Sequence, residues 1–268
     1  AIFRLNQLVE WFVVAQQRPL RFSTALLKTG GYPKFIENLA NPGGVVADLE
    51  AIAKVANEAG VPMVVDNTMA TPFLSQPFEW GADIVVHSTT KFLSGQGNAL
   101  GGVVIDSGKF PWLGNSKYPS LSEPSPEYNG LTFAETFGDL AYTMYSHAIS
   151  LRDLGCSQSP MNAWITLNGI ETLPLRIERH CSNALAVAQF LEKHASVEWV
   201  SHAGLESSPY YELGKKYLPD GTGSVFTFGV KGGYESGLKM LETVELFSHV
   251  ANIGDTHSLI LHPASTTH

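Results

Sequence analysis

A lysine follows a strongly apolar run in this sequence, in a setting that suits a reactive amine. The stretch DIVVHSTTKFLSGQGNALGG, residues 83 to 102, places Lys91 behind the hydroxyl residues Ser88, Thr89 and Thr90 and ahead of a glycine-rich segment. A lysine that forms a Schiff base needs a fixed and partly desolvated site, whereas a surface lysine needs no such setting. Taken alone, a lysine such as Lys91 would be a solvated surface residue in most proteins, so its neighbours decide the interpretation.

A carboxylate occupies the corresponding position after a second apolar run. Asp66 ends the run VPMVVD, and we interpret this run and DIVVHS as buried strands because both are short, continuous and rich in β-branched residues. Parallel strands present their carboxyl ends to one crevice, where ligands of open α/β folds bind. Asp66 and the residues from Ser88 to Lys91 are therefore expected to face one site. A carboxylate placed there needs a cation or hydrogen-bond donors nearby.

The amine, the hydroxyls and the carboxylate together fit one cofactor, pyridoxal phosphate. The carboxylate would keep the pyridine nitrogen protonated, the hydroxyls would hold the phosphate, and the lysine would form the Schiff base. Each element alone is a weak signal, because an aspartate after a strand is more often a cap or turn residue and serine-threonine clusters are usually loops. A Schiff-base aldolase without cofactor would leave Asp66 and the hydroxyls unexplained.

The pattern around these strands predicts an α/β fold. The segment VVADLEAIAKVANEAG has apolar residues at helical spacing, with Asp48 able to cap its start and Gly60 its end. GGVVID, residues 101 to 106, adds another strand. From Ser107 to Pro160 the chain is rich in proline, glycine, serine and aromatic residues and too long for a simple connection. We expect this segment either to pass over a functional face or to be a plain surface loop.

The later part of the chain has a different pattern. From Ser159 to His194 the periodicity predicts two helices, or one helix kinked at Pro174. VEWVSHAGL, GSVFTFGV and GLKMLETVELFSHV then indicate strand, strand and helix, an α+β arrangement. We therefore predict a large cofactor-binding domain over residues 1–165 and a smaller C-terminal domain over residues 166–268. Residues 1–32 show little clean periodicity and support no element.

Composition narrows the classes of function. No apolar run reaches the ~20 residues that a membrane span needs, and the first residues lack the order of a signal peptide, so we expect a cytoplasmic protein without a membrane partner. The net charge of −8 with scattered basic residues disfavours a nucleic-acid partner and favours a small-molecule substrate. Cys156 and Cys181 lack metal-site spacing, and we expect both to be buried apolar residues.

Four longer stretches resemble the trans-sulfuration family of pyridoxal-phosphate enzymes. They are ENLANPGG, VVDNTMATPF, DIVVHSTTKFLSGQGNALGGVVID and FSHVANIGDTHSLILHPASTTH. The long segment after GGVVID and the NIGD sequence resemble the sulfhydrylase branch. The resemblance implies fold type I of the pyridoxal-phosphate transferases, which is aspartate-aminotransferase-like. That fold has a mostly parallel sheet covered by helices, plus a smaller α+β C-terminal domain that would here be truncated.

The resemblance also implies roles for residues around the cofactor. Lys91 matches the Schiff-base lysine of the family, and Ser88 and Thr90 match its phosphate-contacting hydroxyls. Asp66 matches the carboxylate that pairs with the ring nitrogen. Thr68 matches the nearby residue of the DNT motif.

Further positions carry weaker implications. Asn41 matches an asparagine that approaches the phenolic oxygen of the cofactor, and Glu37 of the same motif is a lesser candidate. Asn252 occupies the place of a substrate-side serine in the lyases of the family. His257 receives no role, and no metal site is expected.

The implied activity is a γ-replacement in methionine biosynthesis. O-acetylhomoserine and sulfide, or a small thiol, would give homocysteine, or methionine, and acetate, in a homotetramer built as a dimer of dimers. One alternative is a cystathionine γ-synthase or γ-lyase, which would share every cofactor residue. Another is a non-catalytic fragment that retains the core of the cofactor site. The family's phosphate loop, ring-stacking tyrosine and substrate-carboxylate arginine have no counterpart here, so we expect a fragment lacking both ends.

Overall fold

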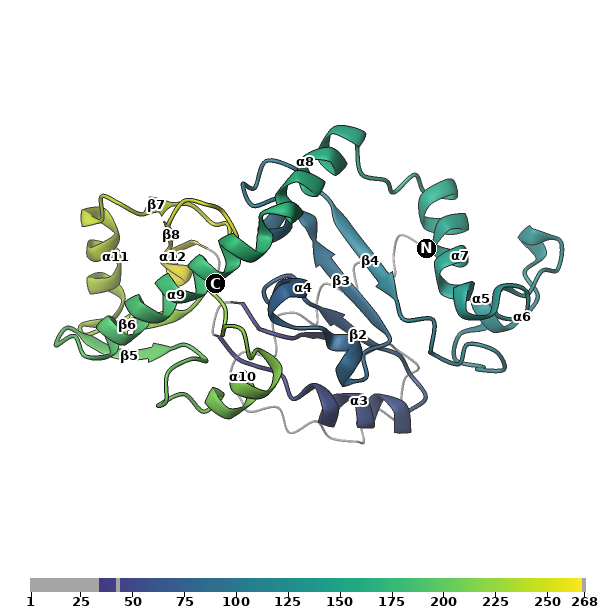
Figure 1. The fold of residues 1–268 in the computed structure, drawn as a ribbon, viewed down its shortest axis with the longest axis horizontal. Helices are drawn as coiled ribbons and strands as arrows, with labels where there is room; N and C mark the ends of the chain where they lie inside the picture. The colour runs from purple at the N-terminus through teal and green to yellow at the C-terminus, as the bar shows by residue number, and fades with distance from the viewer. Residues whose placement is uncertain (1–33, 42–43, 267–268) are drawn as a thin grey trace.

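A four-stranded sheet lies at the centre of the computed structural model, which describes residues 34–41 and 44–266 (Figure 1). The strands are β1 (Lys34–Glu37), β2 (Met63–Asp66), β3 (Ile84–Ser88) and β4 (Gly102–Asp106), in that order across the sheet. β1 and β2 pair in parallel, and so do β2 and β3. The sequence predicts the parallel strands β2 and β3, but it did not predict β1. From the sequence, no regular element is expected over residues 1–32. These residues lie outside the described ranges, so this expectation stays a prediction.

β4 runs antiparallel to β3. The chain reverses at the carboxyl end of β3, in the segment that contains Lys91 and the glycine-rich loop, so β4 starts beside the end of β3. The rule that every strand points its carboxyl end at one crevice therefore holds for β1, β2 and β3 but not for β4.

The predicted first helix forms with the expected ends. α3 spans Leu49–Glu58, and the Asp48 carboxylate accepts a hydrogen bond of 3.3 Å from the Ala51 amide. Such a cap satisfies one of the amide groups that the first turn of a helix leaves without a partner. Gly60 follows the helix with φ of +60°, a conformation that glycine adopts at little cost.

The crossover between β2 and β3 contains α4 (Thr71–Leu74) and the 3₁₀ turn η3 (Pro77–Trp80). The buried amide of Asn67 holds it in place. Its Nδ2 donates to the carbonyl oxygens of Thr71, at 3.1 Å, and Ser75, at 2.9 Å. Its Oδ1 accepts a hydrogen bond of 2.9 Å from Asn38. The ends of β1 and β2 are thereby tied to the same crossover.

The segment from Ser107 to Pro160 forms short helical turns that pack on the sheet. They are α5 (Pro119–Ser122), η5 (Pro126–Tyr128), α6 (Phe133–Phe137), η6 (Gly138–Leu140), α7 (Ala141–Ser146) and η7 (His147–Asp153). An aromatic cluster that includes Phe110, Trp112 and Phe133 packs against Ile84 of β3, while the neighbouring Val85 belongs to the main core. Because successive strand residues face opposite sides, the sheet is covered on both faces. That this segment covers a functional face stays a prediction.

Two separate helices follow, as one of the two alternatives predicts. They are α8 (Pro160–Glu171) and α9 (Leu173–Glu192), and Pro174 lies in the first turn of α9, where its missing N–H costs nothing. Figure 1 shows α9 running from the sheet toward the C-terminal part of the chain.

The C-terminal part contains the predicted strand, strand and helix, together with smaller elements. β5 (Val197–Ser201) and β6 (Thr227–Val230) pair antiparallel, and α11 spans Gly233–Thr243. The sequence did not predict α10 (Tyr211–Tyr217). β7 (Ser248–His249) pairs in parallel with β8 (Leu259–Ile260), and α12 (Pro263–Thr266) follows.

The main core draws on both predicted domains. Leu39 and Val65 belong to the same buried cluster as Ile177, Ala203 and Leu218. The boundary between residues 165 and 166 stays a prediction, and the largest core extends across it.

The two cysteines differ in environment. Cys181 is buried in α9, as expected, but Cys156 is exposed, so the prediction for Cys156 is wrong. Cys156 lies in the connection between η7 and α8, where the chain runs along the surface. Within the described part of the chain, no group of metal-binding side chains is found, and no helix has the length and apolar character to cross a bilayer.

Candidate active site

Lys91 lies in a π-helical turn, η4 (Thr89–Leu93), that begins where β3 ends. Its backbone, with φ of −91° and ψ of −125°, leaves the helical region, so contacts rather than helix geometry set the position of its side chain. The ammonium group donates a hydrogen bond of 2.7 Å to Oδ1 of Asn252, and the side chain is partly buried. This amine is held and partly desolvated, which are the two conditions that a Schiff-base lysine needs.

The carboxyl ends of β2 and β3 are joined by two hydrogen bonds. The Thr68 amide donates to Oδ1 of Asp66 at 2.9 Å, and the Ser88 amide donates to the Thr68 hydroxyl at 2.8 Å. The structure therefore brings Asp66, Thr68 and Ser88 together at the edge of the sheet from which the Lys91 turn starts. The position of Thr68 between the two strand ends suits a residue that orients its neighbours.

β1 brings a second carboxyl group to this edge. Glu37 pairs in register with Asp66, and its Oε2 accepts a hydrogen bond of 3.1 Å from the Asn41 amide. Burial raises the pKa of Glu37 above its ordinary value, the bond from Asn41 opposes that shift, and the negative charge of Asp66 adds to it. Asn41 itself is exposed. The motif that contains Glu37 and Asn41 thus lies next to Asp66.

The three hydroxyl residues before Lys91 differ in how they are bonded. The Thr90 hydroxyl donates to the Gly101 carbonyl at 3.3 Å and accepts from the Gly101 amide at 3.1 Å, so it ties the turn to the start of β4. The Ser88 hydroxyl makes no hydrogen bond with any described residue. The Thr89 hydroxyl is buried and also lacks a partner among them. Of the two predicted phosphate ligands, Ser88 has the more available hydroxyl.

The segment that carries Asn252 lies directly against the Lys91 turn. Gly254 has φ of +75°, and a Cβ at this position would lie 2.5 Å from the Phe92 amide nitrogen. A Cβ on Gly97 would lie 2.5 Å from Nδ2 of Asn252. Two glycines therefore permit the close approach that places Asn252 on Lys91. His257, for which no role is predicted, contacts Asp255 through a 2.8 Å interaction.

Sequence reasoning missed several residues that shape this site. His87 is buried in β3, and burial lowers its pKa while the negative charge of Asp66 partly opposes that shift. Asn67 belongs to the DNT motif, so its position directly after a strand was an available signal. Arg176 of α9 reaches the Lys91 turn, and nothing in its local sequence marks it.

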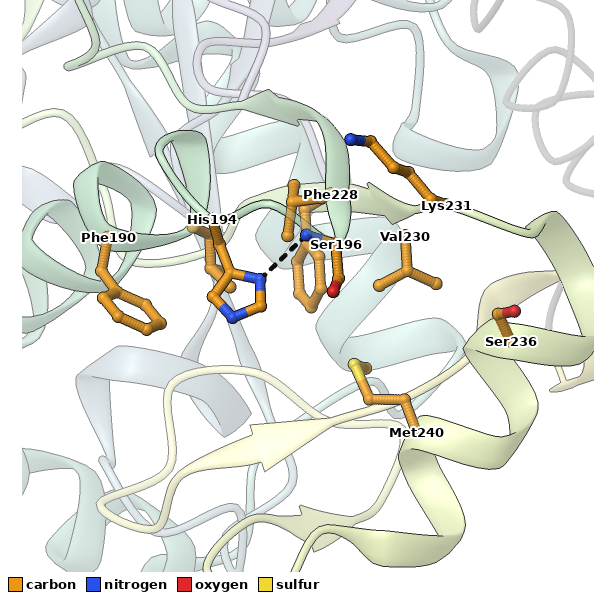
Figure 2. A pocket seen from close by; sticks show the side chains of 10 residues that line it. Phe190, His194, Ser196, Phe228, Val230, Lys231, Ser236 and Met240 are labelled. Carbon is orange, nitrogen blue, oxygen red and sulfur yellow. Dashed lines mark hydrogen bonds between the residues drawn. The ribbon is translucent and has the colours of Figure 1, made fainter.

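The C-terminal part contains a pocket of about 380 Å³ that is separate from these residues. It lies between α9, β5, β6 and α11, and Phe190, Phe228 and Met240 contribute apolar side chains to it (Figure 2). At one side, Nδ1 of His194 accepts a hydrogen bond of 3.2 Å from the Ser196 amide. None of the predicted site residues lines this pocket, so the candidate site is at the sheet edge.

Solved structures define the class of fold. A Campylobacter jejuni protein described as a candidate O-acetylhomoserine (thiol)-lyase, solved with a pyridoxyl-lysine phosphate, matches with a TM-score of 0.84 at 40% identity, over 88% of this chain and 56% of the other. Cystathionine γ-synthase from Xanthomonas oryzae pv. oryzae matches with a TM-score of 0.70 at 32% identity, over 88% and 52%. The fold is that of the pyridoxal-phosphate-dependent transferases of fold type I, as predicted.

Sequence comparison then defines the family. Residues 22–268 match the Cys/Met metabolism PLP-dependent enzymes, and the chain belongs to this family. The O-acetyl-L-homoserine sulfhydrylase of Leptospira meyeri is 50% identical over 243 residues, and the homocysteine synthase of Schizosaccharomyces pombe is 48% identical over 236 residues. Each match covers 87% of this chain and 55% of the relative, so the chain spans about half the length of these curated relatives.

Proposed function

We propose that this protein catalyses a γ-replacement in which O-acetylhomoserine and sulfide, or a small thiol, give homocysteine, or methionine, and acetate. The names of the relatives at 50% and 48% identity support this choice of substrates. The observation that carries the proposal is the partly buried amine of Lys91, hydrogen-bonded at the edge of the sheet where Asp66 also lies.

The residues at this edge fit pyridoxal phosphate. Oδ1 of Asp66 accepts a hydrogen bond from the Thr68 amide. Oδ2 of Asp66 has no hydrogen bond or ion pair within the described residues, so this oxygen can pair with a protonated ring nitrogen. The hydroxyl of Ser88 is available for phosphate. We propose that six residues bind the cofactor: Lys91, Asp66, Ser88, Thr90, Thr68 and Asn41. When bound, pyridoxal phosphate supplies an aldehyde that reacts with amines and a ring that takes up an electron pair.

The side chains of the site then have distinct tasks. Nζ of Lys91 holds the cofactor and, once free, takes the proton from the α-carbon of the substrate. Oδ1 of Asn252 accepts a hydrogen bond from that amine and so restrains its direction; Asn252 also lies on the substrate side of the site. Thr68 orients the carboxylate of Asp66, which keeps the ring nitrogen protonated.

We also propose a cytoplasmic homo-oligomer, a dimer of dimers for the full-length protein. Met161, Trp164 and Leu167 of α8 are each 63% exposed, and their spacing places them along one side of the helix. A contiguous exposed apolar surface of this kind suits a contact between subunits. Cys156 and Cys181 are unpaired, which suits a reducing compartment.

Trapping of the cofactor tests the site. The purified chain is mixed with pyridoxal phosphate, reduced with borohydride and mapped by peptide mass spectrometry. We expect visible absorbance before reduction and a reduced adduct on Lys91 after it, and we expect Lys91→Ala to remove both. Lys109→Ala, a change at an exposed lysine, should leave both intact. A colourless chain without an adduct would favour the non-catalytic fragment.

Substrate assays test the reaction. We expect the chain loaded with cofactor to release acetate and form homocysteine from O-acetylhomoserine and sulfide. Parallel assays supply cystathionine or methionine alone. Turnover of cystathionine without turnover of the first pair would assign the chain to the cystathionine enzymes of the family.

A further inference from the structure

Helix α9 holds the residue that follows Lys91. Nη1 of Arg176 donates a hydrogen bond of 2.8 Å to the carbonyl oxygen of Phe92. The ring of His180, one turn further along α9, packs edge-on against the Phe92 ring with the two centroids 5.6 Å apart. Residues four apart share one side of a helix, so Arg176 and His180 contact Phe92 together.

The other donors of Arg176 connect the Lys91 turn to the corner between α8 and α9. Nη2 donates to the Gly169 carbonyl at 2.6 Å, and Nε donates to the Thr172 hydroxyl at 3.1 Å. The guanidinium is half-buried, and no carboxylate forms an ion pair with it in the described ranges. Its contacts are therefore to carbonyl and hydroxyl groups that a rigid planar fork can hold in fixed relative positions.

The C-terminal segment approaches the same peptide group. A Cβ on Gly254 would lie 2.5 Å from the Phe92 nitrogen and 2.8 Å from the carbonyl carbon of Lys91. Gly254 thus lies against the peptide bond between Lys91 and Phe92, and Arg176 binds the carbonyl oxygen of Phe92. Because the backbone of Lys91 is not helical, these contacts fix the direction in which the lysine leaves the turn.

We propose that Arg176 is a positioning residue, which fixes the Lys91 turn through the Phe92 carbonyl and so sets where the reactive amine lies. The inference rests on the proposed function of Lys91. A displacement of a reacting group by about 1 Å can cost up to about a hundredfold in rate. Loss of the Arg176 contacts is therefore expected to act on the chemistry of Lys91 as well as on stability.

Hydrogen exchange of the cofactor-free chain tests the contact itself. Arg176→Lys keeps the positive charge but loses the planar fork, and Arg176→Gln removes the charge as well. Arg179→Lys, at an exposed position of the same helix, is the matched control. The amides of Ser94 and Gly95 report on the turn, since they donate to the carbonyls of Thr89 and Lys91. Both Arg176 variants should exchange these amides about tenfold faster than the parent chain and the control.

A second measurement distinguishes positioning from mere stabilisation. In the chain mixed with pyridoxal phosphate, we expect Arg176→Lys to form the trappable Lys91 adduct about tenfold more slowly and to shift the pH midpoint of its visible absorbance. Parent-like exchange, adduct rate and pH midpoint in Arg176→Lys would overturn the proposal, even if that variant melts at a lower temperature. Absence of any adduct in the parent chain would instead overturn the proposed function, and the exchange measurement would still decide whether Arg176 fixes the turn.

Discussion

Lys91 and Asn252 form a hydrogen bond of 2.7 Å although 161 positions separate them in the sequence. Lys91 lies between β3 and β4 of the central sheet, and Asn252 belongs to the C-terminal part of the chain. The direction of this amine therefore depends on how the two parts pack against each other.

Substitution of Asn252 is expected to reduce turnover without preventing attachment of the cofactor. Asn252→Ala removes the acceptor that restrains the amine, and we expect kcat with O-acetylhomoserine and sulfide to fall roughly ten- to a hundredfold. Asn252→Asp replaces the neutral acceptor by a carboxylate that can form an ion pair with the ammonium group, and we expect kcat to fall in this variant as well. Asn168→Ala, at an exposed asparagine of α8, serves as the control. Parent-like kcat in Asn252→Ala would contradict a role in orienting the amine.

Gly254→Ala is expected to damage both stability and the site. Any side chain at positive φ costs about 1 kcal/mol, and this one would also collide with the Phe92 amide. Gly130→Ala is the matched control, because Gly130 has a similar φ of +81° and open space around it. We expect Gly254→Ala to lower the free energy of unfolding by about 1–3 kcal/mol more than the control does. Equal losses in urea titrations would show that the close approach has no energetic role.

The two cysteines should differ sharply in reactivity. Cys156 is exposed, whereas burial raises the pKa of Cys181 to about 11. The thiolate is the reactive form, so a thiol reagent at about pH 8 should modify Cys156 rapidly and Cys181 only after unfolding. Cys156→Ser should remove the fast phase of the modification reaction, as measured by the absorbance of the group that the reagent releases. A fast phase that survives this substitution would contradict the burial of Cys181.

Stability should decrease as the solution is acidified from neutral pH. Burial lowers the pKa values of His87, His180 and His202, so these rings stay neutral in the folded chain when an unfolded chain takes up protons near pH 6.5. The unfolded state then binds more protons, and the contribution of these rings is lost as the pH falls from about 6.5 toward their lower folded pKa values. We expect His87→Gln to flatten this dependence in urea midpoints measured between about pH 7 and pH 5, whereas His249→Gln, at an exposed position, should not.

Local sequence predicted those parts of the fold that local physics determines. β2 and β3 end at Asp66 and Ser88 because each is a short apolar run, and α3 starts at its Asp48 cap. The direction of β4 was not predictable, because a short apolar run is compatible with both parallel and antiparallel pairing. The short helices of residues 107–155 have too few residues to show a period, and aromatic packing holds them in place.

The residues of the candidate site also fall into those that local sequence predicts and those that it does not. The positions of Asp66, Ser88 and Lys91 follow from strand ends, which local sequence reveals. Asn252 was found only through resemblance to a family. Arg176 contacts a residue 84 positions away, and no local pattern could mark such a contact.

The shared core described above makes the two predicted domains interdependent. Tyr217 of α10 donates a hydrogen bond of 2.6 Å to Asp48, so the C-terminal part also completes the cap of α3. A chain severed between residues 165 and 166 would leave Leu39 and Val65 on one piece and Ile177 and Leu218 on the other, each facing water. Neither piece is expected to fold without its counterpart. We therefore expect the two parts to fold in one cooperative transition, and the same transition brings Asn252 into contact with Lys91.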